Sequence, residues 1–166
     1  MNKLKCYTIA GAVFVLIAGT VSHFVYEWSG NQPAVGLFFP VNESVWEHMK
    51  LLFFPMLFYA LAVNKRLRSD YPCAVSALSA GLLTGTFMIP ALFYIYSGIL
   101  GRNTLPLDIA VFAVSIIAAF AAVYRLSLSC RARKRERLLK YLVLLLTLCF
   151  WLFTYFPPQL GLFATP

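Results

Sequence analysis

The chain has 166 residues, of which 61% are hydrophobic and only 12% are charged. Soluble domains are about half apolar and a quarter charged, so this composition excludes an ordinary water-soluble protein. One membrane span uses about 20 apolar residues, and spans with short loops therefore leave no room for a soluble catalytic domain. The net charge of +8 does not predict nucleic-acid binding, because the basic residues lie in short loops and the positive-inside rule accounts for them.

Five apolar runs predict an all-α membrane protein, a five-helix transmembrane bundle that forms one domain over residues 1–166. The expected helices cover about 6–27, 44–64, 73–98, 107–126 and 138–156. The first run is too long for the apolar region of a cleaved signal peptide, so we expect a membrane helix there. The loop 28–44 contains two glycines and two prolines, which predict irregular structure.

Local signals mark where several of these helices begin, end or pack. Ser44 and Glu47 form a capping box that predicts a helix start at Ser44. In the third helix, Gly81 and Gly85 have the spacing that lets two helices approach closely in lipid. The last helix should stop at Pro157, because proline disrupts a helix interior.

The basic residues predict the orientation of the chain in the membrane. Two of them, Lys50 and Arg102, fall at one end of the five-helix arrangement, and twelve fall at the other. The twelve are Lys3, Lys5, Lys65, Arg66, Arg68, Arg125, Arg131, Arg133, Lys134, Arg135, Arg137 and Lys140. This bias predicts a cytoplasmic N-terminus and an external C-terminus. The basic stretch 131–137 is at the same time a candidate contact for anionic lipid headgroups in the bilayer.

The four cysteines, Cys6, Cys73, Cys130 and Cys149, show neither a CxxC pair nor the spacing of a secreted disulfide framework. The predicted topology puts three of them near the cytoplasm and one within a span. We therefore expect four reduced thiols.

Ionisable residues gather at the predicted outer side. The second helix has an uninterrupted apolar run only over 51–63, which is too short to span, so its first two turns must enter the headgroup zone or the bundle. Ionisable groups at such depth are functional-site candidates by default. The candidate ligand-binding residues are His23, Glu27, Glu43, Ser44, Glu47 and His48. We expect His23 and His48 to converge.

Several interpretations of this polar site compete. A metal site would recruit His23, Glu27 and His48 with either Glu43 or Glu47, a mixed nitrogen and oxygen set that suits Zn²⁺ or another transition metal. Such a centre would allow a membrane-embedded metal-dependent hydrolase. A binder or transporter of a small hydrophobic molecule is the non-enzymatic alternative.

Two further readings use the same segment. Ser44 with His48 as its base has the residue types of a nucleophilic site, although no oxyanion hole is identifiable. In the purely structural reading, Ser44 and Glu47 cap the helix, and Glu47 pairs with Lys50.

The segment PVNESVWEHMKLLFFP at 40–55 resembles an uncharacterised family of bacterial integral membrane proteins, domain of unknown function 6512. Further matches to that family are His23, Tyr26, Trp28, the stretch 93–101, Asp108 and the stretch 154–163. The resemblance covers nearly the whole chain. It implies a bacterial, Gram-positive host and a multi-pass protein of the cell membrane, and it carries no activity.

A weaker likeness is to the tryptophan-rich sensory proteins of the translocator family. It rests on five helices, a similar length and the stretch from Phe38 to Trp46. That family implies tetrapyrrole or sterol binding, but this chain has only three tryptophans and carries Glu43, Glu47 and His48 where the family is mostly apolar. The likeness therefore serves as a fold analogy only.

Overall fold

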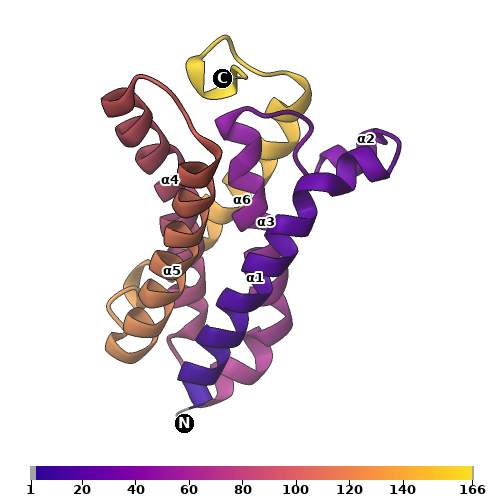
Figure 1. Ribbon diagram of the computed structural model, residues 1–166. Coiled ribbons are helices and arrows are strands. Elements are labelled where there is room, and N and C mark those ends of the chain that lie inside the picture. The colour runs from indigo at the N-terminus through magenta and orange to yellow at the C-terminus, as the bar shows by residue number, and fades with distance from the viewer. Residues whose placement is uncertain (1–2, 166) are drawn as a thin grey trace.

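The computed structural model describes residues 3–165, and helices form nearly all of this part of the chain (Figure 1). Five of the helices are long: α1 (Lys3–Trp28), α3 (Val45–Asp70), α4 (Ala74–Leu100), α5 (Leu105–Ser129) and α6 (Glu136–Tyr155). Three are short: α2 (Pro33–Gly36), η1 (Arg133–Arg135) and η2 (Gly161–Phe163). The predicted all-α class is thus confirmed.

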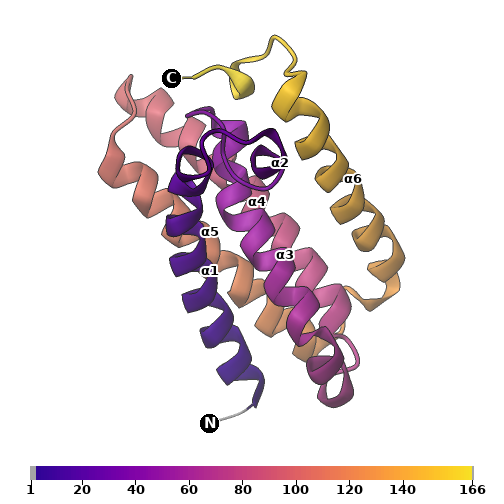
Figure 2. The ribbon, with the colours of Figure 1, turned by 90° about the vertical axis from the view of Figure 1, so that its right-hand side faces the viewer.

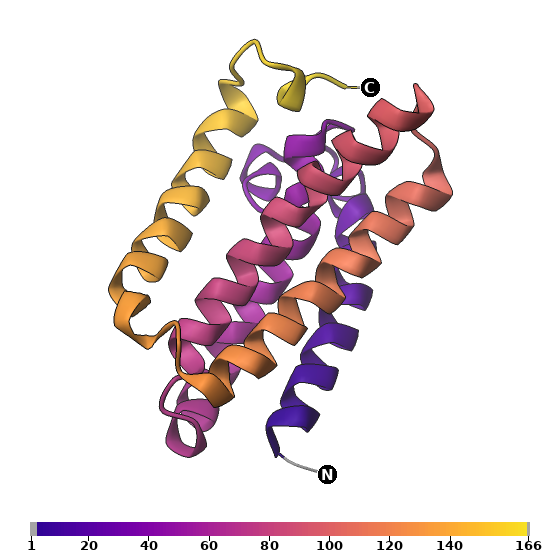
Figure 3. The same ribbon diagram turned by 90° about the vertical axis from the view of Figure 1, so that its left-hand side faces the viewer.

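The long helices run between two ends of the bundle (Figure 1). At the basic end lie the start of α1, the turn between α3 and α4, and the stretch between α5 and α6. The amine of Lys3 is 3.2 Å from the carboxylate of Asp70 there. At the opposite end, here called the loop end, lie the loop 29–44, the loop 101–104 and the chain after α6 (Figures 1 and 3).

Four segments are long and apolar enough to cross a membrane: α1, α4, α5 and Arg133–Tyr155, which includes α6. Their outward faces carry large exposed side chains such as Ile17, Ile95, Ile117 and Leu145. In water this surface would be unfavourable, whereas lipid solvates it. These helices support a multi-pass membrane protein.

Helix α3 is the exception, and it lies in the middle of the molecule, between α1 and α6 in the view of Figure 2. It contacts α1, α4 and α6. Leu52, Phe53 and Met56 are completely buried, while Glu47 and Lys50 at one end and basic residues at the other lower its hydropathy. Helix α3 is therefore long enough to span a membrane, but it is too polar to be counted among the four apolar segments.

The predicted close approach at Gly81 and Gly85 is confirmed, and its partner is α5. A Cβ atom on Gly81 would lie 2.6 Å from the carbonyl oxygen of Ala119, and one on Gly85 would lie 2.7 Å from the Cβ atom of Ala119. Only glycine permits these separations, so the two backbones meet as small-residue spacing predicts.

Helix ends agree with the predicted ends to within three residues, except for α3, which continues to Asp70 rather than ending near Asn64. The extra turns contain Lys65, Arg66 and Arg68, which are good helix formers, and the next proline is at position 72. The predicted start at Ser44 is confirmed, because its side chain accepts a hydrogen bond from the Glu47 backbone N–H. The capping box is only half formed, since the Ser44 backbone N–H donates to Asn42 Oδ1 and not to the Glu47 carboxylate.

The expectation of four reduced thiols is wrong, because Cys73 and Cys130 form a disulfide with their Cα atoms 5.3 Å apart. The two positions are 57 residues apart in the chain, so no local spacing reveals the pair. They meet because α4 and α5 pack along each other and bring the start of one beside the end of the other. Cys6 and Cys149 are free.

We predict that denatured, unreduced protein reacts with two maleimide equivalents per chain and that reduced protein reacts with four. The reason is that only Cys6 and Cys149 carry thiols before reduction. Intact mass spectrometry measures both numbers. Cys73→Ser frees Cys130 and should raise the unreduced value to three, whereas Cys6→Ser should lower it to one. Four labels on unreduced wild-type protein would contradict the disulfide.

Candidate functional site

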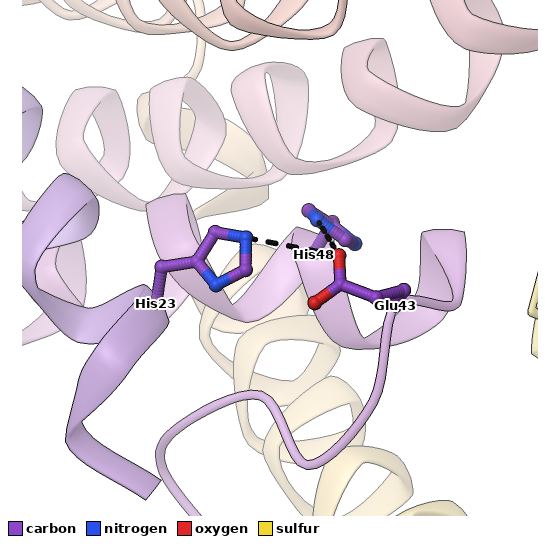
Figure 4. A group of neighbouring side chains, drawn as sticks. All are labelled: His23, Glu43 and His48. Carbon is purple, nitrogen blue, oxygen red and sulfur yellow. Dashed lines mark ion pairs between the residues drawn. The ribbon is translucent and has the colours of Figure 1, made fainter. Parts of the chain in front are cut away.

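Three of the predicted site residues converge at the loop end: His23 from α1, Glu43 from the loop before α3, and His48 from the start of α3 (Figure 4). The Glu43 Oε2 atom lies 3.7 Å from His23 Nε2 and 3.4 Å from His48 Nε2. The two imidazole rings meet edge to face with centroids 5.3 Å apart. The predicted convergence of the histidines is confirmed.

The start of α3 positions two of these side chains. Asn42 Oδ1 accepts a hydrogen bond from the Ser44 backbone N–H, which shapes the turn before the helix. His48 lies one helical turn beyond Ser44, and its Nδ1 atom is 2.9 Å from the Ser44 carbonyl oxygen. Glu43 therefore sits directly before a helix whose first turn presents His48 to it.

The contact with Ser44 also decides which His48 nitrogen carries a proton. A carbonyl oxygen only accepts hydrogen bonds, so Nδ1 must be the donor. In the neutral ring, Nε2 then has a free lone pair, and this lone pair faces the Glu43 carboxylate. Two acceptors at this distance repel unless a cation lies between them: a second proton on His48 or a metal ion.

The two separations from Glu43 suit a metal ion. Ligands bound tetrahedrally to Zn²⁺ at about 2.0–2.1 Å lie about 3.3–3.5 Å from one another. The two distances from Glu43 to the histidines are close to this range, and one ligand atom of each residue lies within 4.8 Å of the others. Hydrogen bonds would be shorter, about 2.7–3.2 Å. The Nδ1 contact of His48 is moreover the arrangement that orients a metal-binding histidine.

Glu47 faces away from this group and takes part in a buried ion pair. Its Oε2 atom lies 2.7 Å from Lys50 Nζ, and the two side chains are 2% and 0% exposed. The remaining protons of Lys50 go to the Gly36 carbonyl oxygen at 2.9 Å and to Thr154 Oγ1 at 2.6 Å. The ammonium group therefore has all three hydrogen bonds that it can donate.

The same pair holds the loop that carries Glu43. The backbone N–H of Val41 donates to Glu47 Oε2 at 2.9 Å, while Lys50 holds the Gly36 carbonyl. Thr154 on α6 lies within hydrogen-bond distance of both charged groups. The loop is thus hydrogen-bonded to α3 at Gly36 and at Val41, and Val41 is two residues before Glu43.

The six candidate residues accordingly have different surroundings. His23, Glu43 and His48 form one group; Ser44 caps α3 through its side chain, and Glu47 is bonded to Lys50. Glu27 is exposed on the last turn of α1 and lies outside the group. Of the two acids that the sequence left as alternatives, Glu43 is the one beside the histidines.

A cavity of about 320 Å³ adjoins the three residues, and all of them line it. Its other walls come from α3, α4 and α5 and are mainly apolar. Two polar residues outside the predicted set, Asn103 and Asp108, line it as well. The Asp108 carboxylate accepts a hydrogen bond from the Tyr96 hydroxyl group. The sequence could have indicated Asp108 as a site residue, because it is an acid at the start of an apolar helix, on the same predicted side of the membrane as the histidines.

The model of a family of unknown function (DUF6512) matches residues 1–165. The chain belongs to this family. Membership confirms the predicted resemblance to this family, and the family description assigns no activity. No curated protein and no solved structure matches the chain. The site must therefore be interpreted from its own geometry.

We predict that Lys50→Met lowers the yield and thermal stability of the protein, because it leaves the Glu47 carboxylate buried without its partner. Breaking one side of a buried ion pair costs about 3–5 kcal/mol. The double variant Glu47→Leu/Lys50→Met should recover much of this loss, since it removes both charges. Thermal unfolding of detergent-purified protein measures the effect, and the exposed Gln32→Ala is the control. Wild-type stability of Lys50→Met would show that the pair contributes nothing.

Proposed function

We propose that this membrane protein binds one divalent transition-metal ion between His23, Glu43 and His48, with Zn²⁺ as the best match. The observation that carries the proposal is the pair of acceptors, His48 Nε2 and Glu43 Oε2, which face each other at 3.4 Å. A cation between them removes the repulsion. Two imidazoles and one carboxylate are a ligand set that catalytic zinc sites use.

The surroundings of the three residues favour a catalytic metal site over a purely structural one. Structural zinc sites have four protein ligands, whereas catalytic sites keep one position for water or substrate. Only three ligands converge in the described part of the chain, and the cavity adjoins them. Bound zinc supplies Lewis-acid polarisation of a carbonyl oxygen or a water made acidic near neutral pH.

Metal-dependent hydrolysis is the more specific form of this proposal, and Asp108 favours it. Its carboxylate lines the same cavity without belonging to the group of three. A carboxylate near a metal-bound water can accept the proton that the water loses. The hydrogen bond from Tyr96 would hold this carboxylate in place.

We expect purified wild-type protein to bind about one equivalent of Zn²⁺ per chain. His23→Ala, Glu43→Gln and His48→Ala should each weaken binding by more than about 100-fold, because residues that merely orient ligands already cost 10–100-fold. Elemental analysis after dialysis against defined free zinc gives stoichiometry and affinity.

Glu27→Gln is the matched control, since Glu27 is an acid at the same end but outside the group. It should bind zinc as the wild type does. If wild-type protein binds no metal, or if His48→Ala binds as well as wild type, the cation between the acceptors is a proton and the proposal is wrong.

We further infer that α3 is a fifth span and that the basic end faces the cytoplasm. Helix α3 has 26 residues, as many as α1; it packs against α1, α4 and α6, and its exposed Phe58 and Leu61 offer an apolar surface to lipid. Twelve of the fourteen basic residues belong to the cytoplasmic side in this orientation. The stretch 131–137 would then contact anionic headgroups of the inner leaflet.

The disulfide at the basic end favours the opposite orientation, because cytosolic thiols are normally reduced. The charge bias is the stronger indication, since it rests on twelve residues and the disulfide is a single feature. The metal site would consequently face the exterior, together with the loop 29–44.

Reporter fusions test this orientation. A reporter active only in the cytoplasm should be active when fused after residue 67 or 134 and inactive after residue 103 or 166, because the positive-inside rule places the basic loops inside. A reporter active only outside should give the reverse pattern. An active cytoplasmic reporter at residue 166 would contradict the five-span arrangement.

A further inference from the structure

We propose that the cavity beside the metal centre binds a single-chain amphiphile whose polar end is uncharged and carries an oxygen that reaches the metal ion. This inference deepens the proposed function and depends on it. It follows from four features of the cavity: its walls, its floor, its size and its charge.

The walls of the cavity determine the apolar part of the ligand. Leu51, Ile89, Phe93, Val111 and Phe112 contribute apolar side chains from three different helices. Binding sites with such walls take up apolar groups, while a few convergent polar groups fix the orientation of the ligand. Here these polar groups are the three metal-site residues, Asn103 and Asp108.

The floor lies where α1 touches α3 and α5. A Cβ atom on Gly19 would be 2.4 Å from the Leu51 carbonyl oxygen and 2.5 Å from Phe112 Cζ, so only glycine allows this contact. His23 is one helical turn further along α1, and His48 is one turn before Leu51 on α3. Leu51 and Phe112 of this contact line the cavity, so a ligand bound over them lies one helical turn from the metal-site residues.

The size restricts the ligand to one chain or one small ring system. Small-molecule sites measure about 300–1,000 Å³, and this cavity of about 320 Å³ is at the lower limit. A two-chain phospholipid is far larger. Because apolar helix faces surround the site, amphiphiles that dissolve in the bilayer are the ligands available in quantity.

The charge excludes an anionic polar end. In the described part of the chain, no lysine or arginine lines the cavity, whereas Glu43 and Asp108 both do. With Zn²⁺ bound, these two carboxylates bring the net charge of the site to zero. An uncharged ester, amide or alcohol keeps this balance, while a phosphate would add negative charge beside Asp108 in a medium of low dielectric constant.

The test uses Co²⁺-loaded protein in nanodiscs of zwitterionic lipid, since the visible absorption of Co²⁺ changes when a ligand enters its coordination sphere. The probes are octanamide, acetamide and octylphosphonate. The longer amide should bind at least about 10-fold tighter than the shorter one, because its additional CH₂ groups are buried in the apolar cavity.

Partition into the nanodisc lipid would favour the longer probe as well, so a pair of variants isolates the cavity. Val111→Phe fills the cavity and should abolish the preference for the longer probe, whereas Val114→Phe adds the same ring to an exposed position of α5 and should keep it. Metal content should be unchanged in both. Equal behaviour of the two variants would overturn the inference.

The charge is tested through Asp108→Asn, in which the amide oxygen can still accept the Tyr96 hydrogen bond. Octylphosphonate should bind about 5–10-fold tighter to this variant than to wild type, while the uncharged octanamide should change less than twofold. No gain for the phosphonate would overturn the uncharged polar end. Failure to load Co²⁺ or Zn²⁺ would instead refute the metal site, and this inference with it.

Discussion

The arrangement of the loop end depends on the buried ion pair between Glu47 and Lys50. Two charges in an apolar bundle are tolerated only when they pair and when their remaining hydrogen-bond capacity is used. Lys50 satisfies this condition with Glu47, Thr154 and the Gly36 carbonyl. Because these groups come from α3, α6 and the loop before α3, satisfying the pair determines where all three segments lie.

The pair and the candidate metal site occupy neighbouring positions of one helix turn. Glu47 and His48 are consecutive, so their side chains point about 100° apart around α3. Glu47 faces α6 and the loop, whereas His48 faces His23 on α1. Two faces of the same helix turn thus carry a structural pair, which is completely buried, and the partly exposed candidate metal site.

This division accounts for the position of α3 in the bundle. A helix that carries charges at both ends is a poor lipid-facing span, but it is stable when other helices cover it and its own charges are paired. Helices α1, α4 and α5 then contribute the remaining walls of the cavity. One helical turn from His23, α1 touches α3 and α5 at Gly19, and the loop 29–44 brings Glu43 to the histidines. The site therefore combines residues from segments that are far apart in the chain.

Much of the helical framework was determined by the sequence alone, because its signals are local. Runs of apolar residues predicted the long helices, Ser44 predicted the start of α3, and the spacing of Gly81 and Gly85 predicted a close helix contact. The convergence of His23 and His48 could also be predicted, because both lie at the same end of neighbouring helices. These inferences need only the periodicity of a helix and the thickness of a membrane.

Only the tertiary structure decided between Glu43 and Glu47. Glu47 is next to His48 and Glu43 lies five residues before it, so either acid could be placed beside the histidines. The sequence offered a pair of Glu47 with Lys50 as one interpretation, but Thr154, more than a hundred residues away, completes the buried pair that removes Glu47 from the site. The disulfide likewise joins positions that meet only after α4 and α5 have packed, and Asp108 lines the cavity for the same reason. Contacts between distant segments leave no periodic pattern in the sequence, so the choice of residues in the site rests on helix packing.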